Sequence, residues 1–344
     1  ATGSRGDIYV AGTTSSPDFL TKNAAQPALG EARILRTTDL GVTWTRVGNP
    51  PQDVNPIVPD PVAPLVLFAG GGKGIYKSVD GGVTWRLVYA FLSLSSFSGG
   101  LAIDPGNHLR VATVEPFSGR LIRSVDGGEQ WTAGGSPCRL SFCQGQLTAD
   151  PTGSGALIVS SFGLWLSLDW GLTFQPLAPP GFWSPSVAAF VPSRPGWIYA
   201  GTAAGVSGSL ALTTDFGATW ASKAAPPNTF SAILNLAVDP DDANRLVAGT
   251  PDALYASSDG AATWTREPSN GGTFQPQTHL AFGILSRSCA SAGGLFALGS
   301  AGAGSNAVAY SPDYGATWKT PKLTSVTSLT VGPGCAAYIT RTLT

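Results

Sequence analysis

The sequence predicts an all-β fold, a single β-propeller of seven four-stranded blades. Two observations carry this prediction. An eight-residue motif occurs seven times, at steps of 41 to 54 residues, and each copy lies in a longer unit that reads as four short strands separated by turns. Units of about 46 residues with several strands each are typical of propeller blades, and 344 residues hold about seven of them.

Each copy of the motif places an aspartate two residues after Ser or Thr and ends in Trp or Phe, as in Thr37–Trp44 and Ser311–Trp318. A short carboxylate accepts hydrogen bonds from its own turn, and the glycine two residues later tolerates positive φ. Ala261 replaces this glycine in the sixth copy, which is therefore expected to be strained or of another type. We expect a structural role for all seven aspartates: Asp39, Asp80, Asp126, Asp169, Asp215, Asp259 and Asp313.

These copies resemble the Asp-box (BNR) repeat, S/T-x-D-x-G-x-T-W/F, of sialidase-like, sortilin-type and xyloglucanase-type propellers. The resemblance implies that the aspartate turns lie at the rim, away from any active site. Residues 7–19 and 25–27 are similar to the SBBP repeat of bacterial secreted and surface proteins. This second resemblance implies a secreted or cell-surface protein, with the periplasm as an alternative.

The units also predict how the ring closes. Eight segments read as the second strand of a unit, against seven motifs, and the first of the eight lies near residues 8–13. We expect residues 1–344 to form one propeller whose first blade is completed by the C-terminal strands near 325–342. The surplus strand then pairs with another edge, or the chain is a processed piece of a longer one. The absence of Met agrees with processing.

The composition excludes several classes of protein. Lys and Arg number 20 against 21 Asp and Glu, so the net charge of −1 argues against a nucleic-acid partner. With 43 % hydrophobic and 12 % charged residues the chain is not of the disordered type. No apolar run approaches the roughly 18 residues of a membrane-spanning helix.

The four cysteines and two histidines bear on metals and redox state. Neither pair of cysteines forms a CxxC motif, and the histidines lie in separate units, so we expect no metal and no cofactor. The even number fits two disulfides and an oxidising compartment, with buried free thiols as the alternative. The cysteines are Cys138 and Cys143 within one loop, and Cys289 and Cys335 near the closure of the ring.

A glycoside hydrolase is one alternative function. The resemblance to sialidases implies an arginine triad and an Arg-Ile-Pro segment, but Arg33-Ile34-Leu35 lacks the proline, and Arg36 and Arg123 lie beside the motifs. The resemblance to xyloglucanases implies two carboxylates, for which Glu115 and Asp252 are weak candidates. Solvated loop acids are the plainer interpretation of both.

Aromatic residues favour binding over catalysis. The loops that join one unit to the next are rich in rings that stack on sugars or anchor a protein, although they can also pack against neighbouring loops. The residue after the motif aspartate is apolar in four copies and is expected to face solvent at the rim. The loop candidates are Phe91, Phe97, Phe182, Trp183, Phe230 and Phe274, and the rim candidates are Leu40, Trp170, Phe216 and Tyr314.

The sequence therefore predicts a non-catalytic scaffold or recognition propeller, outside the cell or on its surface. Its partner would be a protein, a glycan or copies of itself, through strand addition or rim contacts. One alternative is a hydrolase that acts on extracellular glycans. The other is an assembly factor similar to photosynthetic Asp-box proteins, although these use a basic patch and no arginine cluster stands out here.

Overall fold

The computed structural model describes strands, turns and loops but no helix among the residues it covers. The described residues are 34–39, 42–48, 54–91, 100–116, 118–137, 146–161, 163–182, 185–202, 209–227, 232–251, 253–267, 282–285, 294–300, 306–313, 317–319, 326–331 and 337–341.

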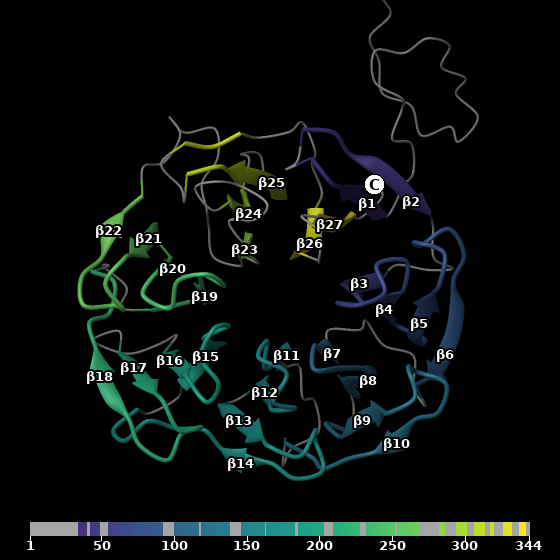
Figure 1. Cartoon of the computed structure of the whole chain (residues 1–344), viewed down its shortest axis with the longest axis horizontal. Helices are drawn as coiled ribbons and strands as arrows, with labels where there is room; N and C mark the ends of the chain where they lie inside the picture. Colours follow the sequence, from purple (N-terminus) through teal and green to yellow (C-terminus); the bar gives the residue numbers. More distant parts are fainter. Residues whose placement is uncertain are drawn as a thin grey trace, which may run out of the picture.

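The sheets stand around a ring, with one strand of each nearest the centre and the following strands further out (Figure 1). Neighbouring strands are antiparallel. The strands of the first half are β1 (Ile34–Thr37), β2 (Thr45–Gly48), β3 (Val54–Pro59), β4 (Leu67–Gly71), β5 (Gly74–Ser78), β6 (Arg86–Ala90), β7 (Leu101–Asp104), β8 (Asn107–Val114), β9 (Leu121–Ser124), β10 (Thr132–Ala133), β11 (Gln146–Ala149), β12 (Leu157–Ser160), β13 (Leu164–Ser167) and β14 (Gln175–Pro176). Those of the second half are β15 (Pro185–Phe190), β16 (Ile198–Thr202), β17 (Leu210–Thr213), β18 (Ala221–Lys223), β19 (Asn235–Val238), β20 (Leu246–Gly249), β21 (Leu254–Ser257), β22 (Thr265–Arg266), β23 (Phe282–Leu285), β24 (Gly294–Ser300), β25 (Asn306–Ser311), β26 (Val326–Val331) and β27 (Ala337–Arg341).

The prediction of seven four-stranded blades is wrong. The structure has six four-stranded blades, and the remaining sheet, β23–β24–β25, has three strands among the described residues. An isolated bridge between Tyr310 and Lys319 stands where the outer strand would pair with β25. Residues 320–325, which follow this bridge, lie outside the described residues.

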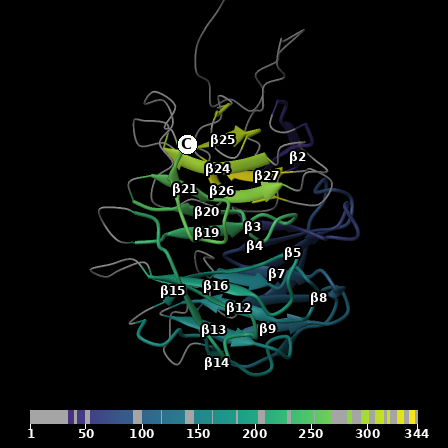
Figure 2. The same cartoon turned by 60° about the vertical axis from the view of Figure 1, so that its left-hand side comes forward.

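The ring closes by joining strands from the two ends of the chain. β1 pairs with β27 from Ile34 opposite Thr340 to Thr37 opposite Ala337, which gives the sheet order β2-β1-β27-β26. Figure 2 shows β26 next to β24 of the following sheet, and the two share the cluster of Phe296 and Leu329. This pairing leaves β1 without an open edge. The expected surplus strand near residues 8–13 lies outside the described residues.

The hydrophobic cores lie between neighbouring sheets, and this explains the sequence of the strands. The second strand of a blade is covered on both faces, so it is apolar throughout, as in β20, where all four residues are buried. The outermost strands β10, β14 and β22 are exposed. The aromatic residue that ends each motif packs into one of these inter-sheet clusters, as Trp44 does against Phe296 with ring centroids 6.5 Å apart.

Candidate functional site

The seven motifs form turns of one design, here called the aspartate turns. In each, the Ser or Thr hydroxyl two residues earlier donates to aspartate Oδ1 at 2.7–2.8 Å. The backbone N–H four residues later donates to the same carboxylate. In every turn but the third, where Gln130 replaces Thr, a Thr hydroxyl donates to Oδ2. The carboxylates thus accept hydrogen bonds from their own turns and stabilise them.

These hydrogen bonds favour the charged carboxylate. The hydroxyl and N–H of the threonine four residues on lower the pKa of Asp80, Asp215 and Asp259 to about 2. The N–H of Gln130 lowers the pKa of Asp126. In the other three turns burial acts in the opposite direction, and the hydrogen bonds still lower the pKa.

In the second to sixth turns, where these residues are described, two consecutive residues have left-handed backbone, and the sequence predicted one. In the second turn Gly81 and Gly82 have φ of 74° and 96°. In the fourth and fifth turns the first of these positions is Trp170 or Phe216, both with φ of 55°. A residue with a Cβ adopts this conformation at a cost of about 1–2 kcal/mol.

Trp170 and Phe216 do not have the exposure to solvent that was predicted for the rim residues. Trp170 is only 2 % exposed and packs into the cluster that contains Leu157 and Val159, because the left-handed backbone turns its side chain inward. Phe216 is partly buried against the next core and lies close to Gly196. Neither residue is a free tip at the rim, and Leu40 and Tyr314 lie outside the described residues.

The sixth turn keeps the same hydrogen bonds although Ala261 replaces glycine. Ala261 has φ of 64°, is fully buried, and donates its N–H to Ser257 Oγ at 3.0 Å. The expected strain is therefore present in the backbone, while the turn type is unchanged. Trp264 differs from Trp85: its indole N–H donates to Ala224 O of the preceding blade, whereas that of Trp85 donates to Gly82 O in its own turn.

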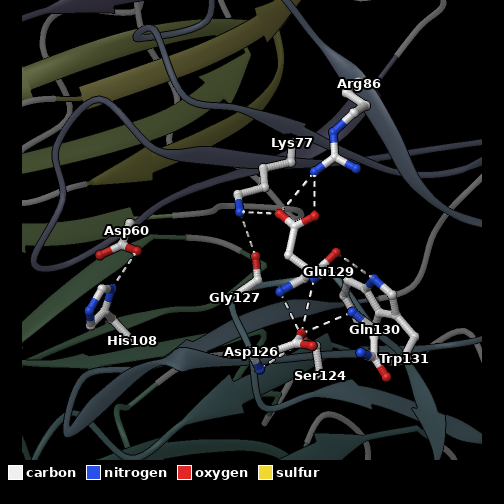
Figure 3. Close-up of polar contacts among 11 residues, drawn as sticks. Asp60, Lys77, Arg86, His108, Ser124, Asp126, Gly127, Glu129, Gln130 and Trp131 are labelled. Atoms are coloured by element: carbon white, nitrogen blue, oxygen red, sulfur yellow. Dashed lines mark hydrogen bonds and ion pairs between the residues drawn. The ribbon is translucent and has the colours of Figure 1, made fainter.

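Cations on the third strand of one blade hold the aspartate turn of the next. Lys77 Nζ on β5 donates to Gly127 O at 2.7 Å and to Glu129 Oε1 at 2.9 Å (Figure 3). Arg123, in the same place on β9, donates to Trp170 O at 3.2 Å. Arg36, in the corresponding place on β1, lies over the Tyr338 ring. Arg36 and Arg123 therefore have structural contacts on the outer part of the ring.

We expect Lys77→Met to lower the free energy of unfolding by about 1–2 kcal/mol, because it leaves a backbone carbonyl without its donor. Arg86→Met is the matched control. Arg86 meets the same Glu129 carboxylate, but its side chain is 60 % exposed against 14 % for Lys77, so its loss should cost less than about 0.5 kcal/mol. Urea unfolding measures both. Equal losses would show that the carbonyl contact contributes nothing.

A second set of aspartates ends the innermost strands or follows them directly, and all four are buried. Each accepts the backbone N–H two residues later, at 2.8–2.9 Å. Asp60 also meets His108 Nδ1 of the next blade at 3.0 Å (Figure 3), and Asp104 meets Arg110 at 3.2 Å. These residues are Asp60, Asp104, Asp150 and Asp239, and their contacts fix the loops on the face that carries the aspartate turns.

The opposite face carries the predicted acid Glu115, which follows β8. Glu115 is 8 % exposed, and its Oε2 accepts a hydrogen bond from Ser118 Oγ at 2.5 Å. Its Oε1 is buried and accepts no hydrogen bond of standard geometry from the described residues. Burial, reinforced by the charge of the Glu115 carboxylate and by side-chain hydrogen bonding to it, raises the pKa of the nearby Tyr89 phenol. The phenol therefore stays protonated at neutral pH.

Aromatic rings adjoin this carboxylate. Tyr89 belongs to β6 of the preceding blade, and its ring meets Phe91 edge-on at 5.8 Å and Trp131 at 5.6 Å. Phe91 and Tyr89 are partly exposed. Tyr89, Phe91, Glu115 and Ser118 form what we call the junction site, since they come from two neighbouring blades.

The other predicted binding and catalytic residues do not extend this site within the described structure. Phe182 is partly exposed in the loop before β15, and its N–H donates to Pro179 O at 3.1 Å. No cluster of three or more metal-binding side chains occurs in the part of the chain that the structure describes. No helix in that part could span a membrane. Outside it lie Asp252, Phe97, Trp183, Phe230, Phe274 and all four cysteines, Cys138, Cys143, Cys289 and Cys335.

Sequence reasoning named Glu115 and Phe91 but missed the contact of Tyr89 with Glu115. Tyr89 was visible as one more aromatic residue in the loop-rich segment after the second motif. Its partner lies 26 positions away on another blade, so only the arrangement of the sheets brings the two together.

The fold defines the protein as a β-propeller, and comparison with solved structures agrees. "YCF48 bound to D1 peptide" matches with a TM-score of 0.56 and 17 % identity, over 84 % of this chain and 91 % of that one. YCF48 from Cyanidioschyzon merolae matches with a TM-score of 0.55 and 13 % identity, over 87 % and 98 %. At these identities the likeness shows the fold alone.

Two GH74 enzymes also match, with lower TM-scores. The GH74 xyloglucanase from Xanthomonas campestris is 16 % identical with a TM-score of 0.49, over 76 % of this chain. The Niastella koreensis GH74 enzyme is 17 % identical with a TM-score of 0.42, over 79 % of this chain. The chain spans 51 % and 57 % of the length of these two enzymes. No protein-family model and no curated protein matches the sequence.

Proposed function

We propose that this protein is a non-catalytic recognition propeller that binds a segment of a partner protein at the junction site. The observation that carries the proposal is the buried Glu115 Oε1, which accepts no hydrogen bond of standard geometry from the described residues and lies next to two partly exposed rings. Leaving such an acceptor unpaired costs about 1–3 kcal/mol, which a donor from a bound segment would recover. The rings supply the apolar contact that anchors a side chain of the partner.

A protein partner agrees with one of the comparisons. The YCF48 propeller in the similar structure is bound to a peptide, and that likeness covers most of both chains. We further propose that the protein acts outside the cell or on its surface, as its low charge and its resemblances suggest. The four cysteines would then be paired as disulfides.

Hydrolysis is less well supported by the site. A glycosidase needs two carboxyl groups about 5–9.5 Å apart, both open to the sugar. Glu115 accepts the Ser118 hydroxyl, and the second candidate, Asp252, lies outside the described residues. The described residues therefore offer Glu115 alone at this site, where a glycosidase needs a pair of carboxyl groups.

The proposal is tested by selecting displayed peptides on the full chain and measuring the affinity of the best one for variants. Glu115→Gln removes the charge and replaces one carboxylate oxygen by an NH2 donor, so it should weaken binding at least tenfold, since a hydrogen bond to a charged group is worth about 1.5–3 kcal/mol. Phe91→Ser should also weaken it. Glu129→Gln makes the same change on the opposite face and should leave affinity unchanged.

A peptide that binds equally well to Glu115→Gln and Phe91→Ser would rule out the junction site. A parallel screen over sialosides and β-glucans checks the alternative. If the protein hydrolyses one of these substrates and a stably folded Glu115→Gln variant does not, its function is hydrolysis and the recognition proposal is wrong.

A further inference from the structure

The face that carries the aspartate turns also carries the exposed large apolar side chains. Of the ten large hydrophobic residues that are exposed in the described structure, nine lie on this face, and all nine belong to its first four blades along the chain. Their exposed fractions run from 46 % to 74 %. We call this set the apolar arc: Val42, Val62, Leu65, Val79, Val83, Leu109, Val125, Leu168 and Leu172.

The arc is built from repeated positions. Val79, Val125 and Leu168 precede the turn aspartate, and Val42, Val83 and Leu172 follow it by three residues. Leu65 and Leu109 come from the neighbouring loop, and their carbonyls accept the turn N–H groups of Gly81 and Gly127 at 2.8 and 2.7 Å. The two sets of side chains therefore adjoin within a blade, and the Lys77 and Arg123 contacts join one turn to the next.

The arc ends where the repeat changes. In the sixth turn the same two positions are Ser258 and Ala262, and the loop position is Asn244, whose carbonyl accepts the N–H of Gly260. The fold of the turn is unchanged there, since the carboxylate of Asp259 accepts the same hydrogen bonds. The apolar side chains are thus not required by the turn.

The exposed area points to a second copy of this chain as the occupant. Beside the arc Glu129 pairs with Lys77 and Arg86, and Asp60 with His108, but the ionised turn carboxylates, such as Asp80 between Val79 and Val83, meet only the donors of their own turns. The net charge of −1 offers little long-range repulsion between copies. The arc exposes on the order of 500 Å² of apolar surface. An interface of standard size buries about 800 Å² per partner, and at the roughly 65 % apolar share of homodimers this is about the same apolar area.

We propose that two copies of the chain associate through their apolar arcs, face to face. A two-fold contact uses the same patch on both copies, so the apolar side chains of one arc meet those of the other, while the turn carboxylates between them repel. This surface lies on the face opposite the junction site, and the proposal is independent of the proposed function. Salt screens the repulsion between exposed charges, so association through apolar burial should strengthen as the salt concentration rises.

Sedimentation velocity of the full chain from 1 to 200 μM tests this. We expect a dimer whose dissociation constant is lower at 500 mM NaCl than at 50 mM. The variant Val79→Ser/Val83→Ala/Leu168→Ser/Leu172→Ala gives two turns the side chains of the sixth turn and should raise that constant at least tenfold. Leu87→Ser is the matched control, because Leu87 is 43 % exposed on β6, away from the arc.

A wild-type chain that stays monomeric at 200 μM overturns the proposal, whatever other protein binds the arc. So does a dimer that persists in the quadruple variant, or one that dissociates at high salt. Circular dichroism of the variants separates loss of association from loss of fold.

Discussion

Gly74→Ala is expected to destabilise the protein by about 3–5 kcal/mol. A Cβ at this position would lie 1.8 Å from the carbonyl oxygen of Tyr89, which belongs to the backbone and cannot turn away. The φ of +149° adds strain of about 1–3 kcal/mol for any residue with a side chain. Displacing β6, which pairs with Gly74 through Ala90, adds an overpacking cost of about 1–3 kcal/mol.

Gly163→Ala is the matched control for this prediction. Gly163 lies in the corresponding hairpin of another blade with φ of +126°, but nothing lies within 4 Å of its Cβ position. Its substitution should cost only the backbone strain, about 1–2 kcal/mol. The urea midpoints of the two variants measure the difference. A Gly74→Ala protein that is found only in inclusion bodies would also show the larger loss of stability. Equal midpoints would show that the close approach to Tyr89 does not constrain the blade.

Acid is expected to unfold the protein between pH 4 and pH 2. The turn aspartates have their pKa lowered in the folded state, to about 2 for Asp80, Asp215 and Asp259, against about 3.9 for an unfolded chain. A lowered pKa contributes stability that is present above the unfolded value and is lost as the pH falls through the folded value. Because all seven shifts have the same direction, their effects add, and urea midpoints from pH 7 to pH 2 measure the fall.

The triple variant Asp80→Asn/Asp215→Asn/Asp259→Asn isolates the carboxylate charge. At pH 7 it should unfold at lower urea than wild type, since each amide loses acceptor capacity for the threonine and serine donors. The difference should shrink as the pH falls toward 2, where the wild-type carboxyls become neutral too. A difference that is the same at pH 2 and pH 7 would show that the charge is not the source of the stability.

The sequence predicted the parts of this fold that depend on local chemistry. The aspartate turns follow from a hydroxyl, a carboxylate and an N–H within seven residues, as in Ser78, Asp80 and Thr84, so the motif determines the turn by itself. The four short strands around residues 236–266 were likewise readable from their apolar segments and turn residues.

What escaped prediction depends on neighbouring sheets. Trp170 was expected at the surface because it lies between the aspartate and the glycine of its turn, yet its ring fills space beside Leu157 that only the packed blades create. The hydrogen bond from Lys77 to the Gly127 carbonyl joins residues 50 positions apart, and no local sequence pattern predicts it. After β25 the described residues show only the bridge of Lys319 to Tyr310, and residues 320–325 lie outside them.

The shared sheet of β1 and β27 has a consequence for synthesis on the ribosome. Thr37 cannot pair with Ala337 until the ribosome has translated the 300 residues that follow Thr37. At about 5–20 residues per second the delay is roughly 15–60 s, during which the edge of β1 is open to other chains. A nascent chain of this protein should therefore need shielding by a chaperone until its last strand has emerged.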